Sequence, residues 1–345
     1  MNVDRFMTKM DEVRFAVSVV VPVFNTGTEE LKNCLLPFQE NVDSRIEIIL
    51  VDDGSDESVA RTVDSLAEAC LVRTRVVHQP NGGQNSARNT GVRCAQGKYV
   101  AFLDSDDEID WQNFLTLVNK AERSDADVIA FKCMKVGPDS SIISDRYGFG
   151  EIPEGEWNRK TLLSRCAELW SQWFRRDYLL EAPAFPTDLR IGEDLETVFP
   201  LLASMRSFVF MPVCVYHYID RQSGITKRAS LERHLDVIKA LQRIIDNPNS
   251  HFDLYREEIE WQIIHHVTVE AVCALSAGRL GLDVARRLRS WAVRTVPDWN
   301  RNPYYQASPN RGRIYVFLIM RSYFGTYLFL RSLKRWLADI GFRRR

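Results

Sequence analysis

The sequence lacks any arrangement of cysteines that would form a metal site or a set of disulfides. Its seven cysteines are scattered over 345 residues, their number is odd, and no two form a CxxC pair. Neither a zinc site nor a disulfide framework is therefore expected, and a reducing, cytoplasmic setting fits best. An excess of charge of one sign is also missing, because 45 basic and 46 acidic residues give a formal net charge of -1. This balance predicts no nucleic-acid partner.

Long apolar runs are missing too. The opening stretch MNVDRFMTKMDEVRF carries charges throughout, so no signal peptide is expected. Residues 314–330 are apolar and aromatic, but Arg321 interrupts them and they are shorter than the roughly 20 residues of a spanning helix. The end of the chain is nevertheless strongly basic, with Asp339 as its single acid. The basic residues from 311 onward are Arg311, Arg313, Arg321, Arg331, Lys334, Arg335, Arg343, Arg344 and Arg345.

Two interpretations of this C-terminal segment stay open. Apolar residues beside a basic cluster are typical of an interfacial helix on an anionic membrane surface, here the inner face of the cell membrane. Alternatively, the helix packs against the rest of the chain or a partner subunit and leaves its arginines in water. The sequence carries no signal for the oligomeric state.

The first half of the chain alternates apolar runs of strand length with helix-like segments. Residues 17–23 and 46–51 are near-continuous apolar runs, typical of strands that are covered on both faces of a parallel sheet. Further strands are expected at 75–78, 99–103 and 127–131, and helices at 56–69, 84–96 and 111–121. Right-handed crossovers then predict a doubly wound α/β fold, with a mostly parallel sheet flanked by helices.

The second half differs in character. Short helices and loops are expected from about residue 158, and successive helices from about residue 230 to the end. This change predicts two regions, 1–229 and 230–345, of which the second is a helical C-terminal extension. In a doubly wound sheet the ligand binds beyond the carboxyl ends of the strands, so the first region is expected to carry the site.

Five acids follow the apolar run in YVAFLDSDDEID, residues 99–110. Glu108 and Asp110 suit the start of a helix, where the helix dipole and capping favour acids. Asp104 and Asp106, two residues apart at a strand end, can converge on one divalent cation. The alternative is a solvated acidic loop, because a lone DxD pattern is common by chance.

The segments after the first two strands lack the usual phosphate-binding glycines. PVFN and VDDGSD are followed by neither GxGxxG nor a Walker loop, so a different nucleotide site is needed. Asp52 at a strand end can accept the imide N–H of a uracil or thymine base or a ribose hydroxyl, while Pro22, Val23 and Phe24 offer an apolar wall. Alternatively, Asp52 caps the helix that follows Gly54.

The segment NGGQNSARNTG, residues 81–91, combines a glycine turn with the start of a helix. Two glycines let the backbone approach a ligand, and the helix start presents N–H groups beside Gln84 and Arg88. A simple reversal of the chain is the alternative.

In order, VSVVVPVFN, VDDGSD, NGGQNSARNTG and YVAFLDSDDEID resemble the inverting family 2 glycosyltransferases, whose nucleotide-binding domain has the GT-A fold. LWSQWFRRDYLLE (169–181), LRIGEDLETVF (189–199) and VYHYIDRQSGITK (215–227) are similar to later blocks of that family. The resemblance covers about residues 16–228. It implies a glycosyltransferase of the hexosyltransferase type that uses a nucleotide-sugar donor, expected to be a UDP-sugar, with Mn²⁺ or Mg²⁺.

The resemblance also implies roles for individual residues. Asp53, with Asp52 beside it, would hold the base, Asp104 would contact the ribose, and Asp106 would ligate the metal on the diphosphate. Asp194 would be the catalytic base; from position alone it is a first-turn helix acid. The expected donor-binding residues are Pro22, Phe24, Asn25, Asp52, Asp53, Gln84, Arg88, Asp104 and Ser105.

Acceptor-side residues are expected in the later blocks. Trp170 and Trp173 lie three apart on an expected helix, so they share a face, which either packs in the core or lets Trp170 line the acceptor subsite. The negative charge of Glu193 favours proton uptake by Asp194. The loop that carries Arg221, Thr226 and Lys227 either closes over the diphosphate or is an ordinary surface loop. These are the acceptor or loop residues Trp170, Glu193, Arg221, Thr226 and Lys227.

The acceptor hydroxyl is expected to belong to a growing polysaccharide, a lipid-linked glycan or a cell-wall polymer. Two other functions remain. A sugar-1-phosphate nucleotidyltransferase would need a glycine- and arginine-rich loop after the first strand, where this chain has PVFNTG. A catalytically silent nucleotide-sugar-binding scaffold would not need the base Asp194.

Overall fold

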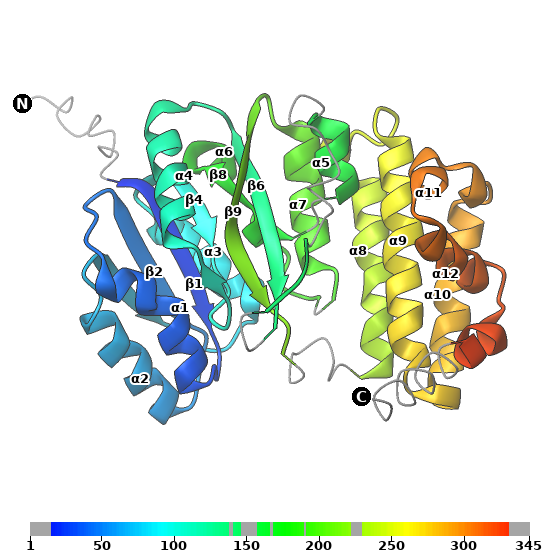
Figure 1. The fold of residues 1–345 in the computed structure, drawn as a ribbon, viewed down its shortest axis with the longest axis horizontal. Helices are drawn as coiled ribbons and strands as arrows, with labels where there is room; N and C mark the ends of the chain where they lie inside the picture. The colour runs from blue at the N-terminus through cyan, green and yellow to red at the C-terminus, as the bar shows by residue number, and fades with distance from the viewer. Residues whose placement is uncertain are drawn as a thin grey trace, which may run out of the picture. The chain divides into compact units, whose positions relative to one another are not determined.

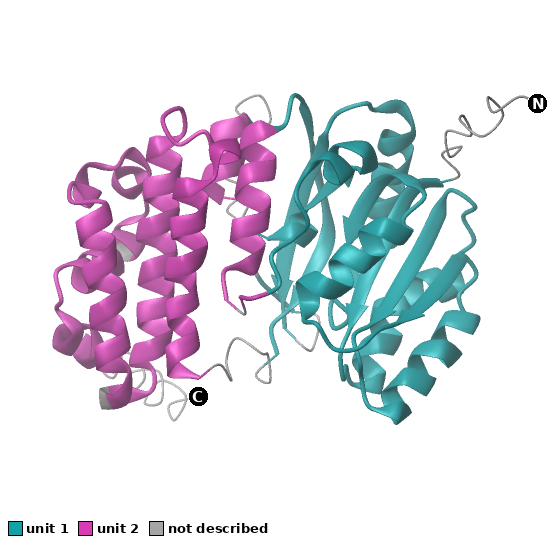
Figure 2. Cartoon of the chain, turned by 180° about the vertical axis from the view of Figure 1, so that it is seen from behind, with its two compact units in different colours: residues 1–157, 168–187, 205–221 teal, residues 158–167, 188–204, 222–345 magenta. Residues whose placement is uncertain are grey.

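The computed structural model describes residues 15–137, 141–145, 157–165, 168–189, 191–221 and 230–330. The contacts divide the chain into two compact units (Figure 2). Unit 1 comprises residues 1–157, 168–187 and 205–221, and unit 2 comprises residues 158–167, 188–204 and 222–345.

Unit 1 is built on one sheet with the strand order β3-β2-β1-β4-β8-β6-β9-β5, and β7 pairs with β6 (Figure 1). Its first four strands are parallel, whereas β8 runs antiparallel between β4 and β6, and β6 and β9 are parallel. The strands are β1 (Phe15–Val23), β2 (Ile46–Asp52), β3 (Arg73–His78), β4 (Gly97–Phe102), β5 (Glu108–Ile109), β6 (Val128–Val136), β7 (Ile142–Asp145), β8 (Gln172–Arg175) and β9 (Phe208–Ile219).

Helices cover both faces of this sheet. Phe38 of α1 packs edge-on against Phe114 of α4, and α1 contacts α2. Since strand addition reverses after β3, right-handed crossovers place α3 on the opposite face, where it contacts β1, β2 and α6. The helices of unit 1 are α1 (Thr28–Glu40), α2 (Glu57–Glu68), α3 (Gln84–Cys94), α4 (Trp111–Arg123) and α6 (Arg176–Glu181).

The close packing of α3 explains one glycine of its motif. A Cβ atom on Gly91 would lie 2.2 Å from Cγ1 of Val20, a fully buried residue of β1. A larger residue would push α3 off the sheet. The start of α3, which follows the loop 79–83, is thereby held at the carboxyl edge of β1 and β2.

Unit 2 is helical and is centred on α9, a 20-residue helix that contacts α5, α8, α10, α11 and α12. Val267, Ala271 and Ala274 are fully buried along it, and the small alanines let neighbouring helices approach. No helix in the described part of the chain is both long and apolar enough to cross a bilayer. The α-helices of unit 2 are α5 (Arg159–Arg165), α7 (Glu193–Ser204), α8 (Asp236–Asp246), α9 (Arg256–Leu275), α10 (Leu282–Thr295), α11 (Pro303–Ala307) and α12 (Asn310–Met320).

The predicted α/β fold and its first strands and helices are confirmed, but the helix expected around Trp170 and Trp173 is wrong. Trp170 lies in a short 3₁₀ turn and Trp173 in strand β8. This strand is buried on both faces between β4 and β6, so its side chains show no alternation that would reveal it. Strand β9 was also not expected: Pro212 interrupts its apolar run and falls where the register with β6 shifts.

Candidate active site

The predicted donor-binding residues lie at one edge of unit 1, where the parallel strands β1 to β4 end. Residues 22–25 end β1, residues 52–53 end β2, and residues 104–107 follow β4. The loop 79–83 joins β3 to α3 beside them. Because parallel strands present their carboxyl ends together, four sequence motifs become neighbours in space (Figure 1).

The two acids after β2 are buried and hydrogen-bonded by the protein. Asp52 accepts the Ser55 N–H through Oδ1 at 3.0 Å, and its Oδ2 lies 2.8 Å from Nδ1 of His78. Burial by itself raises the pKa of Asp52, but hydrogen bonds from Ser55 and His78 outweigh it and hold the pKa below its usual range. Asp52 therefore caps the turn that leads into α2 and not α2 itself, whose N-cap residue is Asp56.

Asp53 organises the glycine loop. Its Oδ1 accepts from Nε2 of Gln79 at 2.7 Å and from the Gly82 N–H at 2.9 Å, and its Oδ2 accepts from the Gly83 N–H at 2.7 Å. Gly83 has a φ of 89°, a left-handed conformation that favours glycine, and directly precedes α3. The carboxylate of Asp53 thus shapes the loop whose backbone was expected to approach a ligand.

Asp104 is held by the first turns of α3. Its Oδ1 accepts from Nε2 of Gln84 at 2.9 Å and from Nη2 of Arg88 at 3.1 Å. Arg88 is fully buried and also donates to Oδ1 of Asn85 at 3.1 Å. Arg88 was expected to face the donor directly; its burial instead makes it an internal partner of Asp104, which is itself 20% exposed.

Residues 104–107 form a tight turn that presents Asp106. The Asp107 N–H donates to the Asp104 carbonyl at 3.0 Å, and Oγ of Ser105 lies 2.6 Å from Oγ1 of Thr26. Ser105 is buried, whereas half of the Asp106 side chain is exposed. Partial burial raises the pKa of Asp106, and the nearby charge of Arg221 lowers it. The DxD pair therefore lies on an ordered turn, with Asp106 at its apex.

The third acid of the turn, Asp107, faces inward. It is 2% exposed, its Oδ2 accepts from the Tyr216 hydroxyl at 2.7 Å, and its Oδ1 accepts from the Ile219 N–H at 2.8 Å. Burial raises the pKa of Asp107 well above its usual range, and the charges of Asp104 and Asp106 raise it further. Crowded carboxylates of this kind gain from a nearby cation.

Arg221, predicted as a loop residue, lies beside this turn. Its Nη1 is 3.6 Å from Oδ2 of Asp106 and donates to the Asp106 carbonyl. Nη1 is also 4.0 Å from Oδ1 of Asp107. The other two residues predicted for this loop, Thr226 and Lys227, lie outside the described residues.

The end of β1 contributes less apolar surface than predicted. Pro22 and Val23 are buried within the sheet, and Phe24, with 51% of its surface exposed, is the part of the predicted wall that a base can reach. Asn25 has a left-handed φ of 48°, donates its N–H to Oγ of Ser55 and accepts from the Asp56 N–H. Asn25 therefore ties the end of β1 to the loop after β2.

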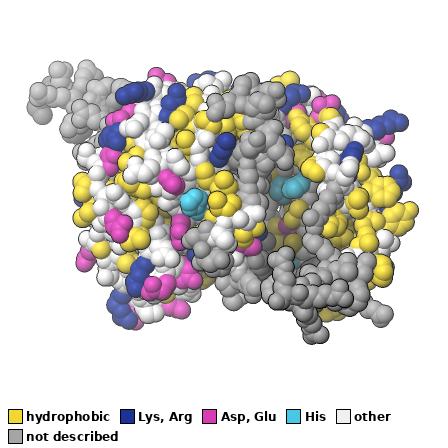
Figure 3. Space-filling model, viewed as in Figure 1, with side chains coloured by type: hydrophobic (Ala, Val, Ile, Leu, Met, Phe, Trp, Pro, Cys, Tyr) yellow, Lys and Arg dark blue, Asp and Glu magenta, His cyan; other side chains and the backbone are white. Residues whose placement is uncertain are grey.

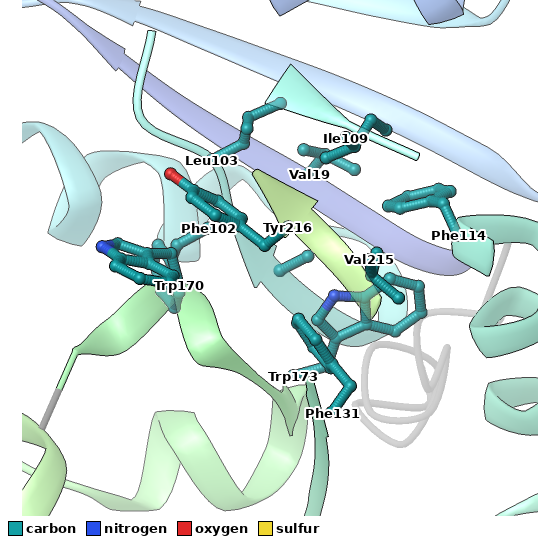
Figure 4. Close-up of a pocket in the computed structure, with 11 residues that line it drawn as sticks. Val19, Phe102, Leu103, Ile109, Phe114, Phe131, Trp170, Trp173, Val215 and Tyr216 are labelled. Carbon is teal, nitrogen blue, oxygen red and sulfur yellow. The ribbon is translucent and has the colours of Figure 1, made fainter. Parts of the chain in front are cut away.

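Trp170 and Trp173 belong to the core, so Trp170 does not offer an open face to an acceptor sugar. Trp170 is 3% exposed and stacks on Tyr216 at 4.3 Å between ring centroids. Trp173 is 2% exposed and packs against Phe114 and Phe131. Together they line an apolar pocket between Leu103 and Ile109, which flank the acidic turn (Figure 4). A pocket without charged groups does not suit a diphosphate.

The predicted base lies in unit 2. Glu193 and Asp194 occupy the first turn of α7, directly after Gly192, and both are half-buried. Gly192 has a φ of 86°, and a Cβ atom there would lie 2.9 Å from Cβ of Ala240. A glycine is therefore needed just before the two acids.

The carboxylates of the turn 104–107 fit a cation that would be shared with a substrate. In the described part of the chain, no three His, Cys, Asp or Glu side chains come together to hold a metal by themselves. Mg²⁺ at phosphate sites is commonly bound by one or two carboxylates plus the substrate phosphates. Asp106 at the apex of the turn, with Asp104 beside it, has the chemistry for that mode.

Sequence reasoning missed His78, Gln79 and Tyr216 as parts of this site. His78 ends β3 and Gln79 directly follows it, so their place at the carboxyl edge of the sheet was the signal that could have found them. Tyr216 had no comparable signal, because it reaches the turn from a strand that was not expected.

Comparison with known proteins finds relatives of this chain. The family model described as "Glycosyl transferase family 2" matches residues 18–179. The uncharacterized glycosyltransferase YibD of Escherichia coli (strain K12) is 32% identical over 290 residues, covering 79% of this chain and 82% of that protein. The uncharacterized glycosyltransferase EpsJ of Bacillus subtilis (strain 168) is 28% identical over 236 residues, which span 64% of this chain and 66% of that protein.

Solved complexes with nucleotide sugars share the fold. Residues 1–349 of S. aureus TarS, in complex with UDP-GlcNAc, align with a TM-score of 0.55 and 16% identity over 89% of this chain and 91% of that chain. The mannosyltransferase PcManGT from Pyrobaculum calidifontis, in complex with GDP-Man and Mn²⁺, aligns with a TM-score of 0.54 and 18% identity over 91% and 86%. The resemblance in architecture is to the GT-A fold.

Proposed function

Because the chain belongs to glycosyl transferase family 2 and is a glycosyltransferase, we propose that it transfers a sugar from a UDP-sugar to an acceptor hydroxyl, with a divalent metal and with inversion. The turn 104–107 carries the proposal. It holds one half-exposed carboxylate among crowded acids at the carboxyl edge of a parallel sheet. A negatively charged diphosphate can approach such acids only with a cation between them.

The donor is proposed to lie along the ends of β1, β2 and β4. The exposed ring of Phe24 supports a stacking contact with the base, and the acids 52 and 53 offer remaining lone pairs to the imide N–H. Asp104, fixed by Gln84 and Arg88, is oriented to accept from a ribose hydroxyl.

Asp106 is proposed to hold Mn²⁺ or Mg²⁺ together with the diphosphate. The bound ion would neutralise the negative charge that develops on the leaving diphosphate. Arg221, beside Asp106, would add a second positive charge on the same side. Thr226 and Lys227, which lie outside the described residues, are proposed to contact the diphosphate as well. These residues favour departure of the nucleoside diphosphate without protonation.

Asp194 is proposed as the general base. It removes the proton of the acceptor hydroxyl while that oxygen forms a bond to the anomeric carbon, and the bond to the diphosphate oxygen breaks with its electron pair. A single displacement inverts the anomeric carbon. The acceptor is proposed to be a polysaccharide, lipid-linked glycan or cell-wall polymer.

The test is release of nucleoside diphosphate by the full chain from UDP-, GDP- and dTDP-sugars, with Mn²⁺ and with a chelator. Metal-dependent release from the UDP-sugar is expected. Asp194→Asn should leave UDP binding with Mn²⁺ within about twofold, whereas transfer falls by about a hundred- to ten-thousandfold. Equal loss of both would contradict the base role. Binding and release that are both absent in the wild type would contradict the nucleotide site.

A membrane surface is the proposed partner of the C-terminal helices. On α12 and the turns that follow it, one side packs on α9 and α10 through Ile319 and Met320, which are fully buried. The other side exposes apolar residues, and Figure 3 shows such side chains on the C-terminal helices. The exposed residues are Ile314, Phe317, Tyr323, Phe329 and Leu330.

The basic residues that would meet anionic lipid, within 331–345, lie outside the described residues. Co-sedimentation with phosphatidylserine vesicles should exceed that with neutral vesicles and fall as salt is raised. No affinity for anionic vesicles at physiological salt would contradict this partner.

A further inference from the structure

The acidic turn 104–107 is anchored by the carboxyl end of β9, a strand remote in sequence. The Tyr216 hydroxyl accepts the Asp104 N–H at 3.2 Å and donates to Oδ2 of Asp107 at 2.7 Å. The Ile219 N–H donates to the other oxygen of Asp107 at 2.8 Å. One phenol group therefore links the first and last residues of the turn, and Asp106 lies between them.

Tyr216 is itself held in place. It is 2% exposed, its ring stacks on Trp170 with an interplanar angle of 14°, and its backbone pairs with Ile109 of β5 and Cys133 of β6. Figure 4 shows the two stacked rings, with the Tyr216 oxygen directed away from Trp173 and Phe131. Tyr216 is therefore fixed by packing on Trp170 and by pairing with β5 and β6.

We infer that Tyr216 is a positioning residue that fixes the orientation of Asp106 for the divalent ion. The inference rests on the proposed function, because it takes Asp106 as the metal ligand. A ligand on a short turn keeps its direction only if both ends of the turn are fixed, and groups that orient a metal ligand typically change metal affinity by 10- to 100-fold when removed. Asp107 is thereby a part of the support, with both oxygens already hydrogen-bonded to β9.

The chain offers a matched control for the loss of a buried phenol. Tyr99 of β4 is fully buried, and its hydroxyl reaches the carbonyls of Ser124 at 3.1 Å and Ala126 at 2.7 Å, neither of which belongs to the turn. Tyr216→Phe and Tyr99→Phe each remove one buried hydroxyl and keep the ring. Both are expected to lower stability, but only the first removes a support of Asp106.

Mn²⁺ binding in the presence of UDP, followed by the EPR signal of free Mn²⁺, tests the inference on the full chain. Tyr216→Phe should weaken Mn²⁺ binding by about 10- to 100-fold, and Tyr99→Phe should leave it within about twofold of the wild type. Urea unfolding of both variants shows that each is folded. Equal Mn²⁺ affinities in the two variants would overturn the inference, with the proposed function intact. A wild type that binds no Mn²⁺ with UDP would overturn both.

Discussion

Two groups of aspartates lie at the ends of β2 and β4, the strands on either side of β1 in the sheet, and the protein surrounds them in opposite ways. Asp52 and Asp53, after β2, are 3% and 2% exposed, and every carboxylate oxygen meets a donor from the protein. Asp106, after β4, keeps half of its side chain exposed among other acids. Acid pairs that look alike in sequence therefore differ in what they can do: the first mainly orders loops, and the second can take a cation.

Asp104 lies between these extremes. One of its oxygens accepts from Gln84 and Arg88, yet the side chain stays partly exposed. The exposure of the acids increases from Asp52 and Asp53 to Asp104 and then to Asp106. This order suits the proposed nucleotide sugar, with its nucleobase at the buried acids, its ribose at Asp104 and its diphosphate at Asp106. The number of protein donors around each carboxylate separates structural roles from ligand-binding roles better than the pattern DD or DxD does.

The largest effect is expected for Asp106→Ala. Loss of the proposed metal ligand should lower the rate of transfer by about a thousandfold, since metal stabilisation of a leaving group contributes several kcal/mol. The free energy of unfolding should change by less than about 0.5 kcal/mol, as for other partly exposed side chains. Rates of nucleoside diphosphate release and urea unfolding measure the two quantities.

Asp125→Ala is the matched control for Asp106→Ala. Its side chain is 93% exposed and forms an ion pair with Lys98 on the surface. Asp125→Ala should change neither the rate of transfer nor the free energy of unfolding appreciably. If Asp106→Ala instead destabilised the protein and kept its activity, Asp106 would belong with the structural acids, and the contrast with Asp53 would vanish.

Asp53→Asn is expected to have a smaller effect, mainly on stability and not on the rate of transfer. The amide cannot accept from Gln79, Gly82 and Gly83 together, so at least one buried donor loses its partner. Unfolding free energy should fall by about 1–3 kcal/mol, and UDP binding should weaken because the loop 79–83 is no longer held. Urea unfolding and UDP titration test this. Asp56→Asn, the same change at an exposed position three residues away, should leave stability unaltered; equal loss in both variants would show that Asp53 is not the anchor.

The positions of these acids could be predicted, but their surroundings could not. Apolar runs such as 46–51 locate the strands because both faces of the sheet are covered, and the acids directly after them must then lie at its carboxyl edge. Which acid is buried depends on donors from elsewhere in the chain. The three donors to Asp53 come from the loop after β3, and the partners of Asp107 come from β9, more than a hundred residues away.

The helix predicted around Trp170 and Trp173 is wrong for the same reason, because tertiary contacts decide the structure there. A spacing of three residues predicts one helix face, yet Gln172 and Trp173 pair with β6 as a buried strand. Gln172 is fully buried, and its amide donates to the Glu168 carbonyl at 2.8 Å. A buried polar residue satisfied by local backbone breaks the alternation that identifies a strand, so tertiary contacts decide the structure there.

The smallest expected effect concerns His78, which bridges the buried Asp52 and Asp64 of α2, with ring nitrogens 2.8 Å and 3.1 Å from the two carboxylates. The hydrogen bond to Asp52 raises the pKa of His78 above 6.5; burial lowers this pKa, and the hydrogen bond to Asp64 raises it further. Asp52 has a pKa below 3.8. The stabilising contribution of a histidine with a raised pKa is complete below about pH 6.5 and is lost as the pH rises through its folded-state pKa. That of Asp52 is present above about pH 3.8 and is lost as the pH falls through its lowered pKa.

The pair should therefore stabilise the edge of the sheet most between about pH 4 and pH 6.5. Because 45% of the His78 side chain is exposed, solvent screens the interaction, and His78→Gln should cost less than about 1 kcal/mol at pH 5.5. The difference between wild type and variant should shrink toward pH 9, where the wild-type imidazole is neutral. Urea unfolding at both pH values, at low and high salt, measures it. A difference that is independent of pH would show that His78 acts as a neutral hydrogen-bond donor. Asp52 would then resemble Asp53, whose carboxylate accepts from neutral donors alone.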